Sequence, residues 1–392
     1  MNPHDYLAVV THSNSSHVMD NFNVLVSGAD ETVHLFFTED VLSKCRAAGK
    51  MLVLIDDSGF INSSRVAALM ASGWAVINLL LGEICLFDPL NLSSLEGMTQ
   101  MRQLVEAMGF DEGKKQKLFC YLNFIAYLDK LASDDEHLTL FKLLYDYGSS
   151  AMVMAKVKDL ICKGVIDEDQ EGYLLSRYSE VACIAPDFEN LMFSLSPFIS
   201  AEKEAITAKR NSAIILPLFE LDGDDNLKAG IMCLLRFGLK KLPPNTYHIL
   251  ITDKGYGARK QLVDFVGKAA DADMTLISKD IFSLGDECLI GTLMQRFDAR
   301  VYARHAAESS CIALEAALGE TKVVKSTYTL HCDRRWSANK PLDVLFGKNK
   351  SETYGSLAPT YEARYRRELI ASLPPGTAIL EYQGNSSIVS CR

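Results

Sequence analysis

The chain contains 392 residues, 48% of them hydrophobic and 23% charged, which suits one large or two ordinary globular domains with a substantial core. Residues 1–5 carry no basic region and no apolar core follows them, so we expect no signal peptide. The longest apolar stretch, residues 74–87, is interrupted by Glu83 and falls short of the roughly 20 residues of a membrane span. The ten cysteines form no CxxC pair, which excludes a zinc ribbon or a redox motif and indicates free thiols in a reducing cytoplasm.

The net charge of −10 is unevenly distributed along the chain. Residues 1–111 carry 13 acidic and 5 basic side chains, whereas residues 291–392 carry 10 acidic and 14 basic ones. The overall acidity argues against broad nucleic-acid binding, and the asymmetry indicates two faces of opposite sign. Solvated charges scattered over the surface are the alternative interpretation.

The first part of the chain predicts alternating strands and helices. Continuous apolar runs predict buried strands, and helical spacing predicts helices between them. The strands are expected at residues 22–28, 51–57, 74–81 and 84–87, and the helices at 38–48 and 63–72. Thr38 is the expected N-cap of the first helix and Gly49 its C-terminal stop. This spacing predicts a βαβαβ unit with a parallel sheet.

The middle of the chain, residues 92–210, shows no convincing strand. Apolar residues recur there at helical spacing, for example in 101–108, 118–128 and 138–144. Strand and helix patterns alternate again after residue 210. Strands are expected at 213–219, 247–252, 274–278, 299–305 and 377–382, and helices at 226–242, 258–270, 287–296 and 359–373. One sheet built from residues 1–91 and 211–392 and interrupted by an all-α insertion over 92–210 accounts for this order.

The strand, glycine and helix of residues 22–48 provide the context of a phosphate-binding loop, whose motif is G-x-x-x-x-G-K-[ST]. Counted from Gly28, the second glycine falls on Val33, the lysine on His34 and the metal-binding hydroxyl on Leu35. Valine disfavours positive φ, histidine is shorter than lysine and mostly neutral at pH 7, and leucine offers no metal ligand. The acidic pair between these positions would also repel a triphosphate. The loop is therefore degenerate.

The acidic strand of such motors is altered as well. In these enzymes an Asp joins the Mg²⁺ shell and a following Glu activates water. Here residues 249–252 run into Asp253 and then Lys254, and a lysine cannot serve as that carboxylate. Asp56 and Asp57, at the end of another strand, indicate either a metal or phosphate site or a βα turn in which a side chain caps the next helix.

The order of these segments resembles the ATPase domain of the large conjugation ATPase of type IV secretion systems and, more loosely, the type IV coupling proteins. The matching segments, over residues 22–330, are Gly28, residues 55–59, residues 87–90, the helical insertion, residues 219–223, Asp253 and the basic pair Arg259-Lys260. The resemblance implies a RecA-like P-loop NTPase fold with an inserted helical subdomain. The departures at the loop and at Lys254 imply a pseudo-ATPase that holds no cofactor.

The remaining candidates concern binding. Adjacent residues 331–333 (His-Cys-Asp) point to opposite faces of a strand, so we expect no metal there. Ser/His/Asp catalysis has no support, because no G-x-S-x-G motif is present. Arginines near aromatic residues suit an acidic protein partner or a nucleic-acid backbone, with solvated surface arginines as the alternative. They are Arg334, Arg335, Arg364, Arg366 and Arg367. Arg300 and Arg304 are further candidates for contact with a neighbouring subunit.

RecA-like domains assemble head to tail, so their two contact faces need complementarity. The segment around the degenerate loop is acidic and is the expected counterpart of a neighbour's arginine; it includes Asp30, Glu31, Glu39, Asp40, Asp56 and Asp57. The sequence thus predicts a non-hydrolysing subunit of a conjugation or type IV secretion apparatus, bound to an active ATPase, a coupling protein or a second copy. An active NTPase with a non-standard phosphate loop and a DNA-binding accessory factor are the alternatives.

Overall fold

The structure is a computed structural model that describes residues 23–81, 94–132, 138–198, 206–221, 225–254, 260–269, 272–284, 286–332, 351–382 and 384–391. The chain divides into two compact units, Met1–Ala303 with Pro375–Arg392, and Arg304–Pro374. The sequence placed residues 211–392 in one part, whereas the structure separates most of residues 304–374 as a unit with its own internal contacts.

The first unit is built on a nine-stranded sheet in the order β11-β10-β7-β1-β6-β5-β2-β4-β3. The strands are β1 (Val24–Ser27), β2 (Met51–Asp56), β3 (Ala75–Asn78), β4 (Ser212–Pro217), β5 (Tyr247–Asp253), β6 (Asp273–Ser278), β7 (Ala299–Tyr302), β10 (Thr377–Tyr382) and β11 (Asn385–Ser390). The strands from β7 to β3 in this order run parallel, and only β10 and β11 are antiparallel to their neighbours. β2, β4 and most of β5 are buried, as the continuous apolar runs predicted.

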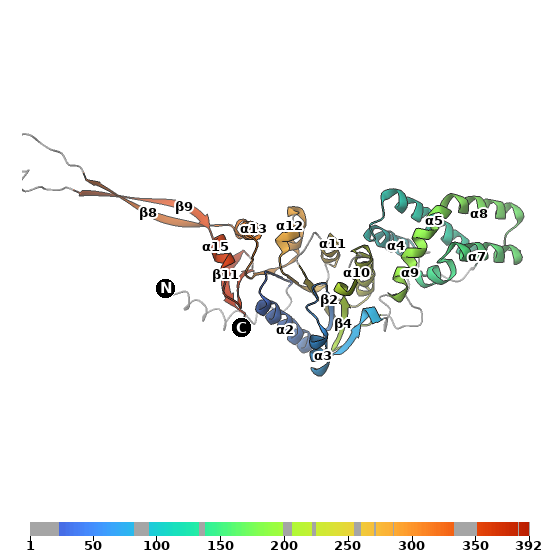
Figure 1. The fold of residues 1–392 in the computed structure, drawn as a ribbon, viewed down its shortest axis with the longest axis horizontal. Helices are drawn as coiled ribbons and strands as arrows, with labels where there is room; N and C mark the ends of the chain where they lie inside the picture. Colours follow the sequence, from blue (N-terminus) through green and yellow to red (C-terminus); the bar gives the residue numbers. More distant parts are fainter. Residues whose placement is uncertain are drawn as a thin grey trace, which may run out of the picture. The chain divides into compact units, whose positions relative to one another are not determined.

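Helices cover the sheet (Figure 1). They are α2 (Glu31–Ala48), α3 (Ser63–Ala71), α10 (Asp225–Lys240), α11 (Lys260–Lys268) and α12 (Glu287–Arg296). Apolar side chains of α2 and α3, among them Phe37 and Leu69, share one core with strand residues such as Leu52 and Val26. Neighbouring helices α10, α11 and α12 contact one another in turn. The carboxyl ends of β1, β2, β5 and β6 therefore lie together at one edge, where nucleotide sites of open α/β sheets form.

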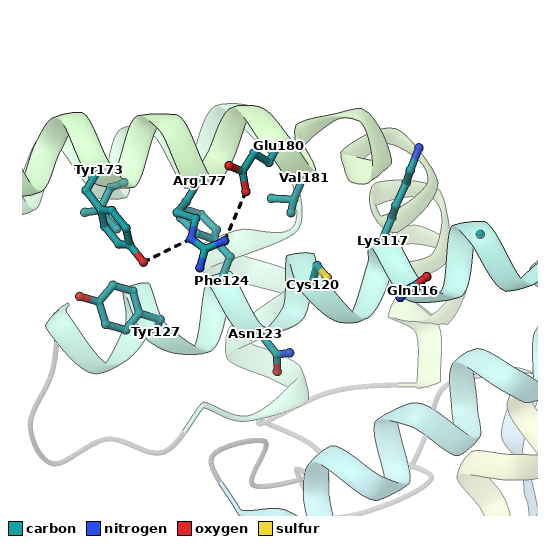
Figure 2. A pocket seen from close by; sticks show the side chains of 12 residues that line it. Gln116, Lys117, Cys120, Asn123, Phe124, Tyr127, Tyr173, Arg177, Glu180 and Val181 are labelled. Atoms are coloured by element: carbon teal, nitrogen blue, oxygen red, sulfur yellow. Dashed lines mark hydrogen bonds and ion pairs between the residues drawn. The ribbon is translucent and has the colours of Figure 1, made fainter.

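The described residues between β3 and β4 form six α-helices, in agreement with the helical spacing of that segment. They are α4 (Leu95–Ala107), α5 (Glu112–Ala132), α6 (Leu140–Tyr147), α7 (Ser150–Cys162), α8 (Glu168–Val181) and α9 (Ala185–Leu195). Helices α4 and α9 contact α10 of the sheet layer. A groove of about 630 Å³ runs between α5 and α8, where Arg177 donates to the hydroxyl of Tyr173 and to Glu180 (Figure 2).

In the second unit, the described residues form a two-stranded antiparallel ribbon and two helices. Its elements are α13 (Glu308–Leu318), β8 (Glu320–Cys332), β9 (Ser351–Ala363) and α15 (Arg367–Ala371). The predicted helix over 359–373 is wrong in its first part, because residues 359–363 are strand residues paired with 320–324 of β8, and only α15 is helical. The ribbon and α13 were not predicted.

Two further expectations differ in detail. Of the predicted strand over 74–81, only β3 is extended, and residues Leu79–Leu81 form a 3₁₀ turn. The Leu80 amide donates to the side-chain oxygen of Asn78 at the start of this turn. The strand expected at 84–87 lies outside the described residues. Within the described part of the chain, no helix combines the length and the apolarity needed to cross a membrane.

Candidate functional site

The turn between β1 and α2 is the position at which a phosphate-binding loop would lie. It contains only residues 28–30, because the helix already begins at Glu31. Gly28 has φ +133°, and a Cβ atom there would come within 2.8 Å of Ala303. Its amide donates to the Ser278 carbonyl at 3.1 Å, which ties the turn to β6. Only glycine fits this close passage of two backbones.

The carboxylate of Asp30 caps the start of α2. Its Oδ1 accepts from the amides of Thr32 at 2.8 Å and Val33 at 3.4 Å, and its Oδ2 accepts from the Gly376 amide at 2.7 Å. The side chain is buried, with 8% of the residue exposed. The first amides of a helix are the groups that bind phosphate in phosphate-loop proteins. Here they already hold a negative group from the chain itself.

The three residues at the diagnostic loop positions all lie inside α2. Val33 is fully buried in the core, and Leu35 is half-buried. His34 is buried and its Nε2 donates to the Gly28 carbonyl at 2.7 Å, with burial holding the pKa of the imidazole below its ordinary value. A neutral histidine in this position fastens the turn rather than reaching toward a phosphate.

The predicted start of this helix at Thr38 is wrong. The Thr38 hydroxyl donates to the His34 carbonyl at 2.8 Å, the i−4 bond of a threonine in a helix interior. Asp30 followed by Glu31 is the effective N-terminal signal, because the aspartate caps the amides and the glutamate lies at the positive end of the helix dipole. The C-terminal stop at Gly49 is confirmed, with φ +65°.

Asp56 organises the turn after β2. Its Oδ1 accepts from the Thr252 hydroxyl at 2.6 Å and from the hydroxyl and amide of Ser58 at 2.9 and 3.0 Å. The amides of Phe60 and Ile61 also donate to this carboxylate. A carboxylate satisfied by so many neighbouring donors acts as a turn-forming group. The cap of the next helix, α3, is instead Asn62, whose side chain accepts from the Arg65 amide at 3.0 Å.

The neighbouring acids are also engaged. Asp57 forms a buried ion pair with Lys228 of α10, with Oδ1 and Nζ 3.2 Å apart and side chains 5% and 8% exposed. Asp253 accepts from the Ser278 hydroxyl at 3.0 Å, and Lys254, half-buried, follows it. Among the described residues no three His, Cys, Asp or Glu side chains converge as metal ligands would.

The candidate arginines are distributed over both units. Arg300 of β7 pairs with Glu381 at 3.1 Å and donates to a carbonyl of α12, so it is occupied within the first unit. In the second unit Arg366 pairs with Glu362 at 3.1 Å and Arg367 with Glu308 at 3.4 Å. Arg304 and Arg364 are exposed in the same unit, and Arg334 and Arg335 lie outside the described residues.

Sequence reasoning did not identify Lys228 and Gly376 as parts of this site. Lys228 is 171 residues from Asp57, and Gly376 is 346 residues from Asp30. No local pattern marks either residue as a partner, because the sheet topology alone brings them to the strand ends.

Comparison with solved structures identifies the fold of this chain. No protein-family model and no curated protein sequence matches the chain. Solved structures do match. VirB4 of Thermoanaerobacter pseudethanolicus is 9% identical with a TM-score of 0.56, over 94% of this chain and 88% of that one. The bacterial conjugative coupling protein TrwB in complex with sulphate is 12% identical with a TM-score of 0.55, over 94% and 85%. The chain has the RecA-like fold of these proteins.

One of the TrwB structures is a complex with ADP and Mg²⁺; it is 12% identical, with a TM-score of 0.52. At these identities the likeness shows the fold, not the activity. The fold predicted from the order of segments is therefore confirmed, as is its likeness to the conjugation and secretion proteins.

Proposed function

We propose that this protein is a non-hydrolysing RecA-like subunit of a conjugation or type IV secretion apparatus, with a structural or adaptor role. Its fold is shared with TrwB and VirB4, which supports a place in that kind of assembly. The loss of activity is inferred from the β1–α2 turn. We expect such a subunit to work in the cytoplasm, beside the other components of the apparatus.

The β1–α2 turn is the observation that carries the proposal. The motif G-x-x-x-x-G-K-[ST] spans eight positions, here residues 28–35, and residues 31–35 already belong to α2. A phosphate chain needs a loop whose amides surround it, and a three-residue turn offers no such loop. The buried carboxylate of Asp30 also occupies the helix start. Both features oppose the binding of a nucleotide.

The acidic strand ends support the same conclusion. Catalysis of phosphoryl transfer requires carboxylates that are available to Mg²⁺ and to water. The Asp56 carboxylate accepts hydrogen bonds from Ile61 and Thr252 in and beside the turn after β2, and Asp57 pairs with Lys228. Because Lys254 follows Asp253, no glutamate stands next to it to activate water.

Calorimetric titration with ATP and Mg²⁺ tests the proposal. We expect no saturable heat up to millimolar nucleotide, and no phosphate release above the buffer rate. A RecA-like ATPase with an intact phosphate loop, titrated in the same buffer, is the positive control. A micromolar dissociation constant for this protein would reject the proposal and favour an active NTPase with a non-standard loop.

The partners of such a subunit are proposed to be other protein subunits, namely an active ATPase, a coupling protein or a second copy. Only some of the acidic residues in the predicted contact face are exposed and able to meet such a partner. Asp30, Asp56 and Asp57 are buried, whereas Glu31, with 73% of its side chain exposed, and Glu39 face solvent. Affinity purification from the native host, with light scattering at low and high salt, tests this. A salt-independent monomer that captures no such subunit would contradict it.

A further inference from the structure

A second pocket lies away from the strand ends, where the helical insertion meets the sheet layer. Its volume is about 580 Å³, and it is bounded by α4, the start of α5, α10 and α11. Helices α4 and α10 pack directly against each other beside it. Its lining carries three cations and three carboxylates, namely Lys115, Arg236, Lys268, Glu106, Glu112 and Asp264.

Arg236 is the unusual residue of this pocket. It is 6% exposed, and only its Nη2 has a hydrogen-bond acceptor in the described part of the chain, the Gln103 Oε1 at 2.8 Å, with the Cys233 sulfur 3.6 Å away. Its buried Nε has none. No carboxylate of the described residues lies within 4.0 Å of the guanidinium.

A buried arginine cannot escape its charge. The guanidinium stays protonated at any pH at which the protein is folded, whereas a buried lysine can release its proton. Cys233 cannot supply a negative charge, because burial raises the pKa of its thiol to about 11. Gln103 is neutral. A buried charge without a counter-ion is strongly unfavourable, and none of the described carboxylates of the pocket pairs with Arg236.

The other two cations that line the pocket are already paired. Lys115 pairs with Glu112 at 2.7 Å, and Lys268 pairs with Asp264. Glu106 is exposed and makes no ion pair with Arg236 in the described structure. Of the three cations in this lining, Arg236 is therefore the one that makes no ion pair with a described residue, and it is deeply buried.

We propose that this pocket binds a small anionic ligand whose carboxylate or phosphate group pairs with Arg236. A planar guanidinium suits both groups, because each offers two oxygens side by side. The amide side chains of Gln103 and Asn226 provide further polar contacts in the same pocket. A volume of about 580 Å³ accommodates a metabolite-sized molecule. A macromolecular backbone does not reach an arginine that is 6% exposed.

Thermal unfolding and calorimetry of the full chain test the proposal. The probes are inorganic phosphate and succinate, each titrated at constant ionic strength against chloride, so that the two anion classes are compared. The variants are Arg236→Gln, which removes the charge, and Arg236→Lys, which keeps it but loses the planar donors. Lys115→Gln is the matched control, because it removes a paired cation from the same pocket.

We expect a saturable rise in Tm of the wild type with at least one probe. Affinity should fall at least tenfold in Arg236→Gln, fall less in Arg236→Lys, and change less than twofold in Lys115→Gln. Without a binding anion, Arg236→Gln should unfold at or above the wild-type temperature, because an uncompensated charge is gone. General salt stabilisation is not saturable and affects all variants equally. The proposal is overturned if neither probe gives a saturable effect, or if Arg236→Gln responds like the wild type. Neither result depends on the nucleotide titration.

Discussion

Replacing His34 by lysine restores the diagnostic residue of a phosphate loop at its position in the sequence. The variant tests whether the missing lysine, or the helix that begins at Glu31, prevents nucleotide binding. His34 is 6% exposed, and its ring donates to the Gly28 carbonyl at 2.7 Å. Losing that bond leaves a buried acceptor unsatisfied, which costs about 1–3 kcal/mol. The variant should therefore be less stable, and it should still not bind ATP.

The lysine adds a second cost. Keeping it neutral at pH 7 means lowering a pKa from about 10.4 by roughly 3.4 units, and each unit corresponds to about 1.36 kcal/mol. Extension of the ammonium group toward water relieves part of this. We therefore expect His34→Lys to lower the free energy of unfolding by about 3–5 kcal/mol, a large share of the stability of a typical domain.

Urea unfolding followed by circular dichroism measures this change. His34→Gln is the control, because its neutral amide can still donate to the Gly28 carbonyl, and it should cost about 1 kcal/mol or less. Calorimetry with ATP and Mg²⁺ completes the assay. The reasoning fails if His34→Lys is as stable as the control, or if it acquires micromolar affinity for ATP, because the helix would then not exclude the nucleotide.

Three other changes test the same site and the sheet. Lys228→Met should lower the free energy of unfolding by about 3–5 kcal/mol, because it removes the cation that pairs with the buried Asp57 carboxylate. Adding Asp57→Asn should recover at least half of that loss. If Lys228→Met alone is as stable as the wild type in urea, the pair is not desolvated. Gly28→Ala should lower Tm more than Gly164→Ala, because both have positive φ but only the first meets a neighbouring backbone; equal Tm changes would contradict the close packing. Burial lowers the pKa of His248 to about 4, so as the pH falls the unfolded state binds a proton before the folded state does. The free energy of unfolding should therefore fall by about 3 kcal/mol at most between about pH 6.5 and pH 4. Urea midpoints should depend less steeply on pH in His248→Gln, and an unchanged slope would refute this role of His248.

The parallel sheet was predictable from sequence for a local reason. Residues 51–55 are apolar without alternation, and the structure pairs β2, which they form with Asp56, on both sides, with β4 and β5. A strand buried on both faces needs an unbroken apolar run, so the pattern fixes the element by itself. Gly49 ended its helix as predicted because positive φ favours glycine.

Competing local signals account for the displaced helix start. Thr38 and Asp30 are both good N-caps, and in the structure Asp30 caps the helix while the Gly376 amide also donates to its carboxylate. The ribbon was missed for a related reason. Residues 359–363 form a strand because they pair with residues 320–324, which lie far from them in the sequence.

The sequence by itself predicted the buried strands β1, β2, β4, β5 and β6, the helical insertion that separates two sets of strands, and the absence of the phosphate-loop residues. These properties follow from the side-chain periodicity of each segment and from the residue types at fixed spacing. Tertiary structure alone decided that Asp57 meets Lys228, that Asp30 closes the start of α2, and that Arg236 is buried without a carboxylate. Such pairings depend on the order of strands in the sheet and on helix packing between distant segments, which no local pattern encodes.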